Sequence, residues 1–153
     1  SPACEEDGGL TPGFFQITLK VMLHRGNAFL VLRDKQSGEG DLPGGRLSAG
    51  EIYRPWGVSI AREIEEELGP SVRFDLESTP LFIQPHWIKN GGHEALAVFF
   101  RGTLTAGDIQ LSDEHDQMAW ADPDCFRPET WFSDHLLEGV QRYLNARERR
   151  LIV

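Results

Sequence analysis

The residues best placed to do chemistry are three glutamates near the middle of the chain. Glu63, Glu66 and Glu67 follow the spacing i, i+3 and i+4. At about 100° per residue, this spacing places their carboxylates on one face of a helix, where the like charges repel and oppose the helix dipole. A bound cation would relieve both penalties, and carboxylate oxygens suit a hard divalent ion such as Mg²⁺ or Mn²⁺. The other interpretation of these glutamates is a solvated acidic face.

The sequence around these glutamates favours the metal-binding interpretation. It reads PGG at residues 43–45, then five residues before Glu51, and, after ten more residues, REIEEELG at residues 62–69. This pattern resembles the signature of the Nudix hydrolases, and a chance match at these positions is on the order of one in a million per chain. The resemblance is close over this segment and loose over the rest of residues 14–150.

The segment departs from the family pattern mainly by an insertion, and in a smaller way by Pro70 at the last position of the pattern. The ten residues between Glu51 and Arg62 are three more than the pattern has, and the extra residues lie around Pro55. Because loop-closure entropy grows only logarithmically with length, we expect the insertion to lengthen the loop before the helix and to leave the helix face intact. The insertion leaves the role of Glu51 open.

The resemblance implies a set of metal-binding and catalytic residues. Glu66 and Glu67 would ligate the metal, Glu63 would be a further ligand or a base, and Gly44 would contribute its carbonyl oxygen. Arg62 would orient these carboxylates. Glycine suits position 44 because a backbone oxygen can approach an ion where no side chain blocks it. We expect Glu67 on a solvent-facing helix surface, so that replacing it by glutamine removes a ligand and keeps the fold.

Members of the family also carry an acidic residue in the loop before a late tryptophan-containing strand, where it binds metal or deprotonates the attacking water. Glu114 is the candidate in this sequence, and Asp113 and Asp116 compete with it. A solvated polar loop is the alternative interpretation. His115 could serve as an acid or base because its ordinary pKa is near neutrality, but we rank it below Glu114 because an isolated loop histidine is usually exposed.

Substrate recognition leaves a weaker trace in the sequence, because most aromatic residues belong to a core and most strand cations to a solvated face. A nucleobase needs a stacking surface, and a diphosphate needs cations. The aromatic candidates are Trp87, ranked first, and then His86, Phe15 and Trp56. The cationic candidates are Arg46, Lys20 and Arg33.

The elements that position these residues follow from hydrophobic periodicity and turn residues. Helices are predicted from about Pro55 to Leu68 and over residues 133–150. The predicted strands cover residues 14–23, 27–34, 72–74, 81–88, 94–104 and 118–121. This order predicts an α/β (α+β) fold, a Nudix-like sandwich with a mixed, largely antiparallel sheet. Residues 1–12 are predicted to be a flexible tail and residues 13–153 a single domain.

Composition excludes several classes of protein. The 153 residues are 40% hydrophobic and carry a net charge of −9, which argues against non-specific binding of nucleic acid. No apolar run approaches the ~20 residues that a membrane-spanning helix needs, and no targeting signal is visible. The two cysteines support neither a disulfide scaffold nor a thiolate zinc site, and we expect a protein of the reducing cytoplasm.

The resemblance implies a metal-dependent hydrolase, with Mg²⁺ or Mn²⁺ as cofactor, that cleaves a diphosphate bond in a nucleoside diphosphate linked to another moiety. The alternatives are a non-catalytic module of the same fold that binds a nucleotide, and a plain interaction domain with an acidic helix. The predicted partner is a small-molecule nucleotide, without membrane or non-specific nucleic acid, and a homodimer is possible. The sequence does not show whether the leaving group is phosphate, pyrophosphate, a sugar or a second nucleotide.

Overall fold

The computed structural model describes residues 9–152, and the side chains of residues 9–147. Residues 10–15 run outside the sheet and helices, with Leu10 and Phe14 exposed. Residues 1–8 of the predicted tail lie outside the described residues. The division into a flexible tail and a single domain therefore stays a prediction.

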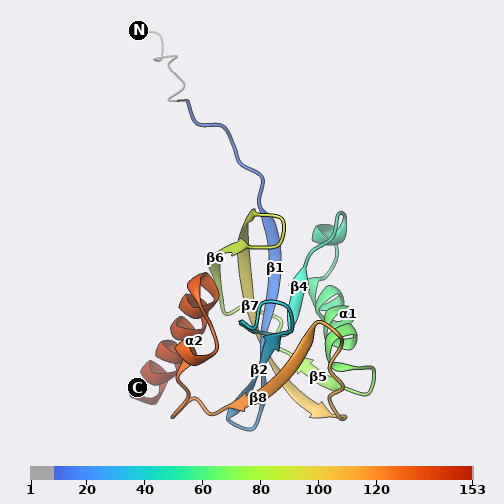
Figure 1. The fold of residues 1–153 in the computed structure, drawn as a ribbon, viewed down its shortest axis with the longest axis vertical. Helices are drawn as coiled ribbons and strands as arrows, with labels where there is room; N and C mark the ends of the chain where they lie inside the picture. Colours follow the sequence, from blue (N-terminus) through green and yellow to red (C-terminus); the bar gives the residue numbers. More distant parts are fainter. Residues whose placement is uncertain (1–8, 153) are drawn as a thin grey trace.

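A central sheet lies between two helices (Figure 1). The helices are α1 (Trp56–Leu68) and α2 (Asp134–Ile152), and two short 3-10 helices are η1 (Glu51–Tyr53) and η2 (Pro128–Thr130). The strands are β1 (Gln16–Arg25), β2 (Ala28–Asp34), β3 (Gly40–Asp41), β4 (Gly44–Arg46), β5 (Arg73–Leu76), β6 (Phe82–Ile88), β7 (His93–Ala106) and β8 (His115–Ala121). In the described part of the chain, no helix is long and apolar enough to cross a membrane.

The sheet is mixed, as predicted. Strands β1 and β7 are parallel, in register from Gln16 opposite Ala95 to His24 opposite Thr103. The other pairings are antiparallel: β7 also pairs with β5 and β6, β1 with β4, and β2 with β3 and β8. The predicted hairpin between β1 and β2 is confirmed, although the two strands pair only beside the turn before they diverge. This divergence opens the sheet where β3 and β4 lie.

Each helix buries its apolar stripe against one face of the sheet. Ile60, Ile64 and Leu68 of α1 pack with Leu19 and other odd-numbered positions of β1. Residues of α2 pack in the same way against the opposite face, in a cluster that contains Leu136, Val140, Met22 and Phe99. Alternation along β1 supplies both faces, and burial of each such side chain contributes about 1.5–3 kcal/mol. The predicted α/β sandwich is confirmed.

Two differences from the predicted elements matter for the site. The composition of residues 34–41 predicts a loop that leads into residues 42–45, but this stretch contains the short strands β3 and β4, which exist because they pair with β2 and β1. Strand β8 begins at His115 rather than at Met118 and pairs with β2 across a register shift beside Asp34. Such short, polar strands depend on pairing rather than on local propensity, so sequence patterns do not reveal them.

Candidate active site

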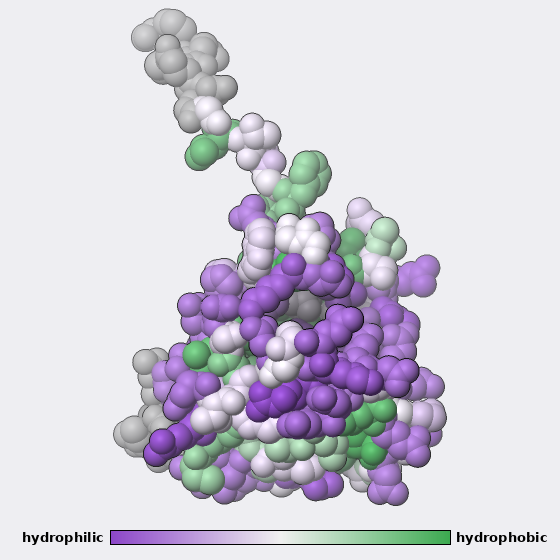
Figure 2. Space-filling view, viewed as in Figure 1, coloured by the Kyte–Doolittle hydropathy of each residue, from purple (hydrophilic) through white to green (hydrophobic). Residues whose placement is uncertain are grey.

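A cavity of about 1060 Å³ opens between the start of α2, the turn after β6, the β2–β3 loop and the acidic face of α1. Hydrophilic side chains dominate the face of the molecule that Figure 2 shows. The predicted residues that line the cavity are Gly44, Gly45, Arg46, Glu63, Glu66, Glu67, His86, Trp87, Glu114 and Lys20. Residues far apart in the sequence thus meet in one place.

Glu67 lies on the floor of the cavity. It is only 4% exposed, and its Oε1 accepts a hydrogen bond of 2.8 Å from the backbone N–H of Gly44. Burial, together with the nearby carboxylate of Asp41, raises the pKa of Glu67 to about 8, although Lys20 opposes the shift. The expectation of a solvent-facing position is therefore wrong for Glu67, because β4 covers this end of the helix face.

The other two glutamates lie progressively nearer to solvent. The side chain of Glu63 is 19% exposed and that of Glu66 is 60% exposed. Burial raises the pKa of Glu63, and Arg62 opposes this shift while Glu66 adds to it. The three carboxylates thus form a graded series from the cavity floor to its rim.

The two glycines before Arg46 allow the backbone to approach these carboxylates. Gly44 has a φ of 136°, and a Cβ there would collide with the carbonyl oxygen of Leu19. A Cβ on Gly45 would collide with the carboxylate of Glu63. Glycine is required at Gly44, whereas a side chain at Gly45 would displace the Glu63 carboxylate. The backbone and carboxylate oxygens at this cradle suit a hard divalent cation.

Arg62 joins the insertion to the acidic face. Its guanidinium bonds both oxygens of Glu51, at 2.9 and 3.0 Å, and lies 3.1 Å from Glu63 and 3.6 Å from Glu66. Glu51 also accepts hydrogen bonds from the Ser59 hydroxyl and from the backbone N–H of Ser48. These two bonds, together with the bonds from Arg62, lower the pKa of Glu51 to about 2. The insertion around Pro55 lies between η1 and the first turn of α1, and Glu51 contacts Arg62 across it.

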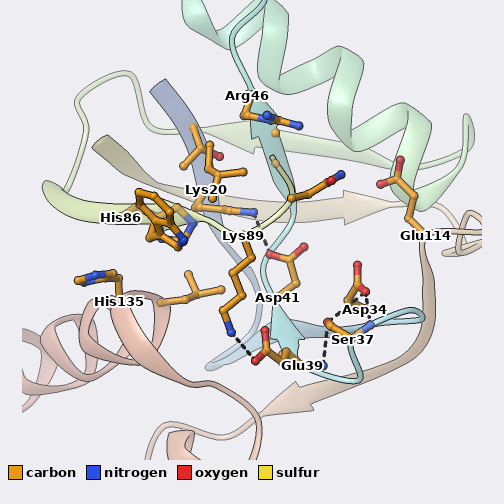
Figure 3. Close-up of a pocket in the computed structure, with 18 of the residues that line it drawn as sticks. Lys20, Asp34, Ser37, Glu39, Asp41, Arg46, His86, Lys89, Glu114 and His135 are labelled. Carbon is orange, nitrogen blue, oxygen red and sulfur yellow. Dashed lines mark hydrogen bonds and ion pairs between the residues drawn. The ribbon is translucent and has the colours of Figure 1, made fainter. Parts of the chain in front are cut away.

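Glu114 and His115 are adjacent in sequence but occupy different environments. Glu114 is exposed and lines the cavity (Figure 3). His115 is 4% exposed, and its Nε2 lies 3.1 Å from Asp41 Oδ2. Burial alone would lower the pKa of His115, but Asp41 and Glu67 outweigh it and raise the pKa. The expectation that His115 is an exposed loop residue is wrong, because β8 carries it beneath the cavity.

Sequence reasoning missed Asp41 as a member of the site. Its Oδ1 accepts a hydrogen bond of 2.8 Å from the ammonium of Lys20, a residue that was predicted as a phosphate contact. Burial would raise the pKa of Asp41, but Lys20 and His115 hold it well below its usual range. Lys20 is therefore already paired with a carboxylate. The only trace of Asp41 in the sequence is its place just before the LPGG run at residues 42–45.

The side of the cavity away from α1 carries aromatic and imidazole groups. Trp87 is 45% exposed there, and burial lowers the pKa of His86 to about 4, so its ring is neutral at pH 7. Lys89 lies 2.6 Å from Glu39 and 3.3 Å from Asp134, and so links the β6–β7 turn to the β2–β3 loop and to α2. This ion-paired link bounds the cavity opposite the glutamates.

Three predicted contact residues lie outside the cavity lining. Phe15 is 55% exposed, and Trp56 packs beside the α1 core and donates from its indole to the Ile52 carbonyl. Arg33 lies 4.1 Å above the Trp131 ring and donates to the Gly38 carbonyl. Arg46 does line the cavity, where its guanidinium donates to Gln16.

Comparisons with known proteins agree with this geometry. A model of the NUDIX domain matches residues 15–139 of the chain. A MutT NUDIX hydrolase from Burkholderia pseudomallei is 24% identical with a TM-score of 0.60, over 75% of this chain and 88% of that one. A MutT protein from Methanosarcina mazei Go1 is 19% identical with a TM-score of 0.69, over 88% and 95%. An Ap4A hydrolase from C. elegans is 19% identical with a TM-score of 0.55, over 71% and 81%. No curated protein matches the chain.

Proposed function

Since the chain belongs to the NUDIX domain family and is a Nudix-type pyrophosphohydrolase, we propose that it uses divalent metal ions to cleave the diphosphate bond of a nucleoside diphosphate linked to another moiety. The observation that carries this proposal is that the three carboxylates of α1 line one cavity, with those of Glu63 and Glu67 against the two glycines. The family assignment favours this enzyme over a non-catalytic binding module.

The donor set supports a metal-binding role for α1. Glu63, Glu66 and Glu67 would hold the ions, with the Gly44 carbonyl as a further oxygen donor. Mg²⁺ or Mn²⁺ bound there would supply charge neutralisation for the diphosphate and a water of lowered pKa. All the donors named are oxygens, which such ions prefer.

The remaining residues of the cavity would bind and orient the substrate. Glu114 lies at the exposed edge of the cavity, where a carboxylate can accept the proton of an attacking water. Glu63, whose pKa is raised, is the competing base. Arg62 would hold the carboxylates in place, and Arg46 would contact phosphate oxygens. In-line attack at phosphorus would follow.

The other end of the cavity supports recognition of a nucleoside. Trp87 offers a partly exposed aromatic surface, and neutral His86 offers both a donor and an acceptor. The C. elegans protein of similar fold is an Ap4A hydrolase by name, and we therefore include dinucleoside polyphosphates among the substrates to be tested. We propose Trp87 as the stacking residue.

A substrate screen tests this function. The purified protein is incubated with Mg²⁺ or Mn²⁺ and with nucleoside triphosphates, dinucleoside polyphosphates, ADP-ribose, nucleotide sugars or NAD, and the products are identified. We expect metal-dependent cleavage of a diphosphate bond in at least one of these classes, and no cleavage in EDTA. Cleavage that is equally fast in EDTA, or a complete lack of cleavage with either metal, would contradict the proposal.

A further inference from the structure

A network of charged side chains from four different elements extends from the cavity floor into the interior. Its members are Lys20 of β1, Asp41 of β3, Glu67 of α1 and His115 of β8. His115 is almost fully buried and does not belong to the cavity lining, so a substrate cannot touch it. Any effect of His115 on the reaction must pass through a neighbour.

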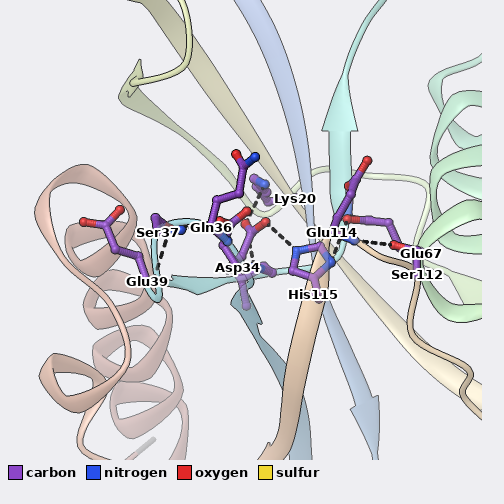
Figure 4. Close-up of polar contacts among 12 residues, drawn as sticks. Lys20, Asp34, Gln36, Ser37, Glu39, Glu67, Ser112, Glu114 and His115 are labelled. Carbon is purple, nitrogen blue, oxygen red and sulfur yellow. Dashed lines mark hydrogen bonds and ion pairs between the residues drawn. The ribbon is translucent and has the colours of Figure 1, made fainter.

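The two ring nitrogens of His115 face two different carboxylates. Nε2 lies 3.1 Å from Asp41 Oδ2, while Nδ1 lies 3.8 Å from Glu67 Oε2 (Figure 4). This Nδ1 is buried and has no hydrogen-bond partner among the described residues. Asp41 therefore fixes the plane of the ring, and the ring aims its second nitrogen at Glu67.

Each oxygen of Glu67 has a different neighbour. Oε1 accepts the hydrogen bond from the Gly44 N–H, and Oε2 faces His115. A carboxylate that is hydrogen-bonded at one oxygen and faces a fixed ring with the other loses less freedom when it binds an ion, and groups behind metal ligands commonly set ligand orientation in this way. The same arrangement keeps two carboxylates, one ammonium and one imidazole together in the interior, where an unpaired charge would be costly.

We propose that His115 is a positioning residue that holds Glu67 in the orientation in which it ligates the metal, with Asp41 orienting the imidazole. The proposal rests on the proposed function, in which Glu67 is a metal ligand. The nearest competing role is direct ligation, because one ligand atom from each of Asp41, Glu67 and His115 lies within 4.8 Å of the others. Against it, Asp41 is already bonded to Lys20 and His115.

Two substitutions of His115 distinguish the contact made by Nδ1 from the contact made by Nε2. In His115→Asn, the side-chain amide falls near the place of Nδ1 and can still face Glu67. In His115→Gln, the amide reaches the place of Nε2 and can keep the contact with Asp41 only. The readout is Mn²⁺ affinity, measured by electron paramagnetic resonance without substrate, alongside thermal unfolding. His93→Gln, at an exposed histidine at the start of β7, is the control for removal of an imidazole.

We expect His115→Gln to weaken Mn²⁺ binding by about tenfold or more, and His115→Asn to retain affinity close to that of the unsubstituted protein. Equal affinities in all three proteins, or equal losses in both variants, would overturn the positioning role. A nitrogen coupling to Mn²⁺ from His115 would overturn it in favour of direct ligation. If the unsubstituted protein binds no Mn²⁺, the proposed function itself fails, which distinguishes the two failures.

A measurement on the unsubstituted protein covers the case in which the variants do not fold. The ¹⁵N resonances of His115 are followed during titration with Mg²⁺. We expect the Nδ1 resonance to shift as Glu67 becomes bound, while the Nε2 resonance moves less because its contact with Asp41 persists. An Nδ1 resonance that is insensitive to saturating Mg²⁺ overturns the proposal.

Discussion

At the scale of single residues, burial decides what each carboxylate can do. Glu67 and Glu66 are neighbours in sequence, yet one is buried under β4 and the other is mostly exposed. The pKa of Glu67 is raised to about 8, so its neutral form is tolerated in the fold, and the cost of ionising it falls when a cation binds. The buried carboxylate of Glu67 is therefore better suited to binding a metal ion than to stabilising the fold.

Replacing Glu67 by glutamine tests this view. We expect Glu67→Gln to lower kcat by at least about a hundredfold, because a charged ligand is lost. We expect its melting temperature in EDTA to stay near or above that of the unsubstituted protein at pH 8, because the amide oxygen still accepts the Gly44 N–H and the cost of burying the Glu67 charge is removed. Steady-state kinetics and thermal unfolding are the measurements.

The matched control is Glu65→Gln, which changes an exposed glutamate of the same helix that does not line the cavity. We expect its kcat to be unchanged. If Glu67→Gln is as active as this control, Glu67 is not a metal ligand.

At the scale of elements, the site is made where a helix meets a short strand. Local periodicity predicted α1, its stop at Gly69 and the shared face of its glutamates, because these depend on residues close in sequence. The same patterns did not reveal β4 or the placement of Asp41 and His115, because the latter two meet only when β8 and β3 pair with opposite edges of β2. Arg33 was misjudged for a similar reason, since its partner Trp131 is far along the chain.

The fit of β4 beneath α1 can be tested at Gly44. A Cβ there would collide with the Leu19 carbonyl, so we expect Gly44→Ala to lower the free energy of unfolding by roughly 2–4 kcal/mol and to weaken metal binding. Gly26→Ala is the control, because Gly26 also has a positive φ, of 61°, but nothing lies within 4 Å of its Cβ position. We expect it to cost about 1 kcal/mol.

Chemical denaturation measures both variants, and Mn²⁺ titration measures the metal affinity. Equal losses of stability in the two variants would mean that the strand does not press against β1 as described.

At the scale of the whole molecule, the fold buries ionisable groups far from the site as well as within it. His24, at the end of β1, is 2% exposed and hydrogen-bonds Tyr143 of α2. Burial, with a contribution from the Arg101 charge, lowers its pKa to about 4. The unfolded chain, with an ordinary histidine pKa near 6.5, therefore binds more protons than the folded chain between these two values.

The lowered pKa predicts acid sensitivity with a definite sign. The contribution of the neutral, buried His24 to the free energy of unfolding is fully present above pH 6.5 and is lost as the pH falls toward about 4. This contribution amounts to roughly 2–3 kcal/mol. Urea denaturation between pH 4 and pH 7 measures it. In His24→Gln, we expect the free energy of unfolding to depend less steeply on pH over this window, whereas an unchanged slope would assign the loss to other groups.

In the whole molecule, we expect the acidic face of α1 and the glycine cradle to hold divalent ions. The most direct test of this expectation is a crystal grown or soaked in Mn²⁺, with an anomalous difference map to locate the metal. We expect a peak within about 2–2.5 Å of carboxylate oxygens of Glu67 and of Glu63 or Glu66. Ordered carboxylates at these positions with no metal peak beside them, at a Mn²⁺ concentration that supports hydrolysis, would contradict it.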